Sequence, residues 1–115
     1  MGLDEFRAEM NAYRQDAVAY AESQKEMQLV SERLGRLYKK FDADERLMAD
    51  QIVGEWILSD DESIRFDAMD LIEDFKIVSA TSALSLLADR LTTSKSPGAP
   101  FERKKIERIL LELEK

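Results

Sequence analysis

Apolar residues recur at helical spacing between residues 60 and 91, and this stretch constrains the fold more than any other. Within residues 62–75 the spacings are four, three and four, which places one stripe on a single helix face: Ile64, Ala68, Leu71 and Phe75. Residues 79–91 carry a second stripe, formed by Ala80, Ala83 or Leu84, Leu87 and Leu91. The stretch predicts two short antiparallel helices joined by a tight turn, with Ser59 capping the first.

Comparable stripes predict four more helices, so we expect one all-α domain over residues 1–115. Only four Gly and two Pro occur, and 44% of the residues are hydrophobic, which favours helices around a real core. Two of these helices are expected over residues 4–22 and 24–41. A third begins at the capping pattern of residues 42–45, and a fourth begins at Pro100. Their expected buried residues are Phe6, Met10, Tyr13, Ala17 and Tyr20; Met27, Val30, Leu34, Leu37 and Phe41; Leu47 or Met48, Ile52, Val53, Trp56 and Ile57; and Phe101, Ile106, Ile109, Leu110 and Leu113.

Two alternatives exist for residues 4–41. Apolar residues recur every seven positions from Phe6 to Phe41, which is compatible with one long coiled-coil helix. The companion stripe changes phase, however, and residues 22–26 are wholly polar, with Ser23 and Glu26 at the spacing of a capping box. We therefore favour a break near residues 22–25. Gly54 lies inside the next helix, where it is unfavourable, and we expect it to permit close helix packing.

The expected helices repeat with a period in the high thirties, which is typical of paired helices in an α-solenoid. Residues 62–91 also resemble a HEAT repeat. Ile64-Arg65 matches the apolar-Arg pair that opens the first helix of that family, Ala68 matches its central Ala, and a Leu-rich second helix follows; Lys76-Ile77-Val78 replaces the usual Gly-Asp-Pro turn. The resemblance implies a short right-handed stack of about six antiparallel helices that works as a binding scaffold.

Negative charge is concentrated in the middle of the chain. Residues 42–74 carry 12 acidic and 2 basic groups, against 7 of each in residues 1–41 and 5 acidic with 8 basic in residues 75–115. Such a field repels nucleic acid and attracts basic partners. The basic cluster of Arg103, Lys104, Lys105 and Arg108 lacks interleaved aromatics, so we expect a solvated face that pairs with acidic groups of the same molecule.

Little in the composition favours catalysis. The chain has no His and no Cys, which removes the commonest general base, the commonest metal ligand and every thiolate site. It has no Gly-rich phosphate loop and no EF-hand loop. We therefore expect no catalytic residues, no metal and no cofactor. No apolar run approaches a membrane span and residues 1–10 do not resemble a signal peptide, so a cytoplasmic protein without a membrane partner is expected.

The function expected from these features is protein binding. The favoured hypothesis is an immunity protein or antitoxin that neutralises a basic toxin, such as a nuclease, by covering its active site with an acidic helical surface. A HEAT-like adaptor or regulatory scaffold is the alternative, and a small enzyme or ligand binder is a third class. The candidate partner-binding residues are Asp60, Asp61, Asp67, Asp70, Glu73, Asp74 and Trp56. Solvated carboxylates and core packing of Trp56 are the simpler interpretations of the same residues.

Overall fold

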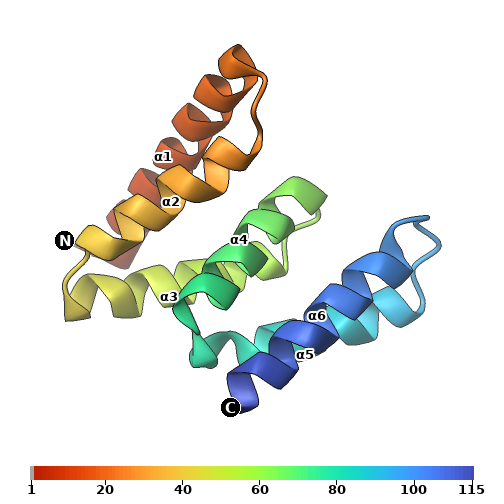
Figure 1. Ribbon diagram of the computed structural model, residues 1–115. Coiled ribbons are helices and arrows are strands. Elements are labelled where there is room, and N and C mark those ends of the chain that lie inside the picture. Colours follow the sequence, from red (N-terminus) through yellow and green to blue (C-terminus); the bar gives the residue numbers. More distant parts are fainter. Residues whose placement is uncertain (1) are drawn as a thin grey trace. The chain divides into compact units, whose positions relative to one another are not determined.

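The computed structural model describes residues 2–115, and within that range it contains six α-helices, one short 3-10 helix and no strand (Figure 1). This confirms the all-α prediction. In chain order the elements are α1 (Leu3–Gln24), α2 (Gln28–Lys40), α3 (Ala43–Ile57), α4 (Glu62–Phe75), η1 (Val78–Ala80), α5 (Thr81–Thr92) and α6 (Ala99–Glu114). The chain divides into two compact units, one up to Ile52 and one from Val53, with the boundary inside α3. The single domain over residues 1–115 stays a prediction.

In the first unit, α1 and α2 form an antiparallel hairpin (Figure 1). The break between them is confirmed, because α1 ends at Gln24 and its C-cap residue Lys25 adopts a left-handed conformation with φ of 57°. The expected capping box is wrong. The Ser23 hydroxyl instead donates to the carbonyl of Tyr20 at 2.6 Å, and α2 begins after Met27 without a side-chain cap. Met27 therefore precedes the helix and is 54% exposed rather than buried.

The capping pattern at 42–45 is confirmed at the start of α3. The Asp42 side chain accepts a hydrogen bond from the Glu45 amide at 2.9 Å, and the Glu45 carboxylate accepts one from the Asp42 amide at 3.0 Å. These reciprocal bonds satisfy two amides that the helix leaves without backbone partners. They also hold the Glu45 side chain in one place, where it lines a pocket of the first unit.

The Tyr38 phenol of the first unit is buried against a carboxylate. Its hydroxyl donates to Asp50 at 2.7 Å, and the residue is buried. Burial, followed by the hydrogen bond to Asp50 and the negative charge of that carboxylate, raises the pKa of Tyr38 to about 12. The neutral phenol is therefore the form that the folded chain stabilises.

We expect the free energy of unfolding to fall as the pH rises from about 10, where the unfolded phenol ionises, to about 12, where the folded phenol does. Over this interval the unfolded chain binds fewer protons than the folded chain, so one such group lowers stability by up to about 1.4 kcal/mol per pH unit. Urea denaturation on both sides of pH 10 measures this slope. Tyr38→Phe should reduce the slope by the contribution of that one proton, and an unchanged slope would contradict the assignment.

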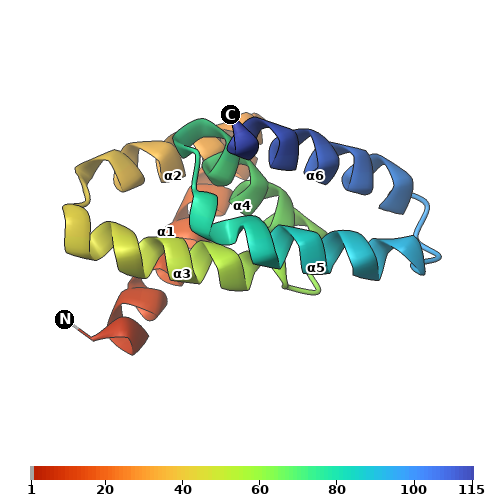
Figure 2. The same cartoon turned by 90° about the horizontal axis from the view of Figure 1, so that it is seen from below.

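In the second unit, α5 and α6 form the closest helix pair and run antiparallel, as Figure 1 and Figure 2 both show. Helix α4 packs on α6, and its Cα atoms approach α5 much less closely. The expected pairing of residues 62–75 with residues 79–91 is therefore wrong, because α5 takes α6 as its partner. Helix α5 thus forms a hairpin with the helix that follows it and not with the one that precedes it. A continuous solenoid stack stays a prediction.

The boundaries of α4 and its buried face differ in detail from the expectation. Asp61, rather than Ser59, is the N-cap, and its carboxylate accepts the Ser63 amide at 2.9 Å. The buried residues are Ala68, Met69, Leu71 and Ile72, whereas Ile64 and Phe75 at the ends of the stripe are half-buried. In α5 the expected stripe is confirmed, with Leu84 rather than Ala83 as its second buried member.

Gly54 in α3 does not serve a close approach. A Cβ built on it would meet no heavy atom within 4 Å, so the expectation that it permits tight helix packing is wrong. We expect Gly54→Ala to raise the free energy of unfolding by about 1 kcal/mol, since Ala loses less backbone entropy in a helix. Thermal denaturation of the variant checks this. A lower melting temperature would reveal a contact that the structure does not contain.

Candidate protein-binding surface

Three consecutive carboxylates, Asp60, Asp61 and Glu62, are exposed at the start of α4. Asp61 is fixed by its capping bond and by the Ser63 hydroxyl, which donates to it at 2.8 Å. Asp60 and Glu62 form no ion pair with any described residue, although both help to raise the pKa of Arg65 after the larger effect of its hydrogen bonds to Glu102. These three residues are hereafter called the acidic corner.

Two other candidate residues are engaged inside the molecule. Lys105 lies 3.1 Å from Asp70, and Arg108 lies 3.1 Å from Glu73, so both pairs join α6 to α4. The expectation that the basic cluster pairs with acidic groups of the same molecule is confirmed for these two cations. Because the pairs are partly exposed, each contributes only a few tenths of a kcal/mol to about 1 kcal/mol. Their main effect is to neutralise the carboxylates of Asp70 and Glu73, which were expected to belong to the acidic binding surface.

The remaining candidates are unequal in exposure. Asp74 is exposed, Asp67 is half-buried, and Trp56 is only 6% exposed. Trp56 therefore packs in the core, as its apolar stripe predicts, and offers little surface to a partner. The structure brings Asp60 and Asp61 together with Glu62 at one end of α4, and directs Asp70 and Glu73 toward α6.

A buried ion pair next to the acidic corner, between Arg65 and Glu102, was not predicted from the sequence. Arg65 Nε and one terminal nitrogen donate to the two carboxylate oxygens of Glu102 at 2.7 and 2.9 Å, while its other terminal nitrogen donates to the Ser59 carbonyl at 3.0 Å. Glu102 is only 2% exposed. The hydrogen bonds from Arg65 to Glu102 are the main reason why the pKa of Arg65 is raised. The sequence does contain a signal for the burial of Glu102. Glu102, Ile106 and Ile109 follow one another at spacings of four and three, which places Glu102 on the apolar stripe of α6.

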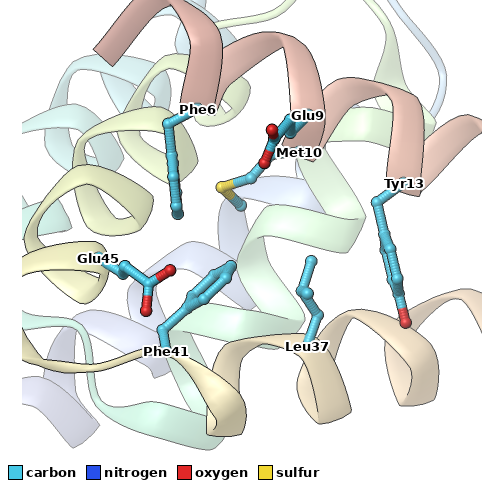
Figure 3. Close-up of a pocket in the computed structure, with 7 residues that line it drawn as sticks. All are labelled: Phe6, Glu9, Met10, Tyr13, Leu37, Phe41 and Glu45. Atoms are coloured by element: carbon cyan, nitrogen blue, oxygen red, sulfur yellow. The ribbon is translucent and has the colours of Figure 1, made fainter. Parts of the chain in front are cut away.

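The first unit contains a pocket of about 130 Å³ between α1, the C-terminal half of α2 and the first turn of α3 (Figure 3). Phe6 and Met10 reach from α1 toward Leu37 and Phe41. The two phenyl rings have centroids 5.0 Å apart and are tilted by 55°. Tyr13 closes one end, and its hydroxyl donates to the Arg33 carbonyl at 3.2 Å.

Two carboxylates complete the lining of this pocket. Glu9 lies beside Met10, and Glu45 lies beside Phe41 (Figure 3). Glu9 is exposed and forms no ion pair within residues 2–115, and no basic side chain lines the pocket. The result is a small apolar cavity with negative charge on two sides. It was not predicted, because residues from separate helices, as far apart in sequence as Phe6 and Glu45, form it.

A shallow hollow on α6 is lined by Phe101, Lys104, Lys105 and Arg108. Phe101 was expected in the core, but it is 69% exposed, because Glu102 occupies the inward position beside it. Lys105 and Arg108 already face carboxylates of α4. The hollow therefore carries less net positive charge than its three cationic side chains imply.

The described residues contain no group of three or more acidic side chains placed to hold a metal ion. Nor does any helix within residues 2–115 combine the length and the apolar character needed to cross a membrane. Comparisons with models of protein families, with curated proteins and with solved structures give no match to this chain.

Proposed function

We propose that this chain binds a protein partner with a basic surface and performs no chemistry itself. In its sharper form the proposal is an immunity protein or antitoxin that neutralises a basic toxin, such as a nuclease, by covering its active site. The observation that carries the proposal is the acidic corner, where the exposed carboxylates of Asp60 and Glu62 form no ion pair with a described residue, while Asp70 and Glu73 are paired with α6.

The charge at this corner supports rapid capture of a cationic partner. Exposed charges of one sign steer an oppositely charged protein and raise its association rate, an effect that falls as salt is added. The bidentate Arg65–Glu102 pair and the Asp61 cap hold the start of α4 in place, so little backbone freedom is lost there on binding. A nuclease would present such a partner surface, because its active-site cleft must attract phosphates.

Affinity capture from the native host tests the proposal with a charge-matched control. The chain is immobilised beside Asp60→Asn/Glu62→Gln, which neutralises two carboxylates of the acidic corner, and Glu107→Gln/Glu114→Gln, which removes two exposed charges from α6. We expect one basic protein to bind the unchanged chain and the α6 control equally. It should bind the corner variant about tenfold to thirtyfold more weakly, since two lost charge pairs at about 0.7–1 kcal/mol each sum to about 1.4–2 kcal/mol.

The nature of the captured protein separates the two forms of the proposal. A toxin whose activity stops when the chain is added, and whose host survives only with the chain present, supports the inhibitor. A basic partner whose activity is unaffected supports the adaptor. An acidic partner, or one held equally by all three proteins, overturns the proposal.

A further inference from the structure

We propose that the pocket of the first unit receives one arginine side chain of the partner. This inference rests on the proposed function, since it names the side chain of the basic partner protein that the chain would bind. It involves a different unit of the chain from the acidic corner, so the two can be tested separately. The size, the walls and the charge of the pocket each bear on the identity of its occupant.

The volume limits the occupant to a single side chain. Sites for small-molecule substrates and cofactors enclose roughly 300–1,000 Å³, and this pocket encloses about 130 Å³. At about 30 Å³ per molecule of liquid water, it has room for the end of one long side chain and no more. A pocket of this size at a protein interface is the usual setting for an anchor residue.

The walls are apolar, aromatic and preformed. Phe6 and Met10 are buried members of the α1 core, so their positions are fixed by packing. The Phe6 and Phe41 rings pack against each other at a tilt of 55°, and the hydrogen bond from the Tyr13 hydroxyl to the Arg33 carbonyl holds the third ring. Such walls suit an aliphatic stem that ends in a flat cation, which is attracted to aromatic faces.

The charge selects a cation over a neutral apolar group. Glu9 and Glu45 contribute two carboxylates, and one oxygen of Glu45 already accepts the Asp42 amide. The capping box therefore holds this carboxylate in place before anything binds. A guanidinium donates several hydrogen bonds in one plane and is more weakly hydrated than an ammonium, which favours arginine over lysine.

The molecule uses the same chemistry for its own arginines in this unit. The Arg33 guanidinium lies 3.7 Å from the centroid of the Tyr20 ring, and that of Arg46 lies 5.2 Å from the Tyr38 centroid. Both arginines thus contact rings that do not line the pocket. Among the described residues, the lining of the pocket includes no arginine or lysine that would occupy it.

The test is an NMR titration of the whole chain with N-acetyl-arginine amide, followed at the Met10 methyl group. We expect saturable shifts with a Kd of about 1–10 mM, as befits a ligand of this size. N-acetyl-citrulline amide has almost the same shape without the charge and should bind at least about tenfold more weakly. Glu9→Gln/Glu45→Gln should lose the response, and a glutamine at position 45 preserves the capping pattern. Glu5→Gln/Glu22→Gln, which removes two exposed charges elsewhere on α1, should keep it.

Equal binding of the citrulline compound, or shifts that do not saturate by about 100 mM arginine compound, would overturn the arginine pocket. Capture of a basic partner through the acidic corner would leave the proposed function standing in that case. Conversely, arginine binding together with a partner insensitive to the corner variant would retain the pocket and remove the corner.

Discussion

Arg65→Ala is expected to lower the free energy of unfolding by about 3–5 kcal/mol, because it leaves the buried Glu102 carboxylate without its partner. The loss comes from the stranded charge more than from the pair itself, since burying two ions carries its own cost. Glu102→Leu in the Arg65→Ala background should therefore recover part of the stability. Urea denaturation of the single and double variants forms the thermodynamic cycle that measures the coupling.

An exposed pair on the same helices provides the control. Arg108→Ala removes the partner of Glu73, and both side chains remain in contact with water. We expect a loss of less than about 1 kcal/mol. An Arg65→Ala variant as stable as Arg108→Ala would show that water reaches the Glu102 carboxylate, which contradicts its burial.

Leu71→Ala is expected to lower the free energy of unfolding by about 2–5 kcal/mol. Leu71 is 1% exposed and lies at the centre of the buried face of α4, so the substitution leaves a cavity that the surrounding helices can close only in part. Leu111→Ala makes the same chemical change at a residue that is 62% exposed in the same unit. It should alter stability by less than about 0.5 kcal/mol. Equal effects of the two variants would mean that the core of this unit is assigned to the wrong face.

Local features were predictable from the sequence because their causes are local. Apolar spacing identified all six helices, the polar run before Met27 indicated the break between α1 and α2, and the box at Asp42 and Glu45 formed as expected. The charge pattern indicated that the basic cluster pairs within the molecule, and Lys105 and Arg108 do so. The first three of these signals depend only on residues that are close in sequence, and the last depends only on how charge is distributed along the chain.

Tertiary features were not predictable, since periodicity shows which face is apolar and not which element covers it. The helical repeat suggested α4 and α5 as a pair, but α6 is the helix that packs on both. Residue type alone placed the apolar Phe101, and not the charged Glu102, in the core of α6. Glu102 instead occupies an inward position that needs a buried cation, and Phe101 turns outward as a result.

The candidate site was predictable in composition more than in arrangement. Acidic residues at 60–74 were found, but the sequence did not separate the exposed Asp60 and Glu62 from the paired Asp70 and Glu73. That separation depends on where α6 lies. The pocket of the first unit depends likewise on contacts between Phe6 and Phe41, which are remote in sequence.

Carbodiimide labelling of carboxylates, read residue by residue by mass spectrometry in the chain alone and in complex with its captured partner, locates the contacted surface. Binding through the acidic corner predicts that Asp60 and Glu62 lose reactivity on complex formation while Glu107 and Glu114 of α6 keep theirs. A complex in which the α6 carboxylates are protected and Asp60 and Glu62 react as in the chain alone would contradict an acidic binding surface.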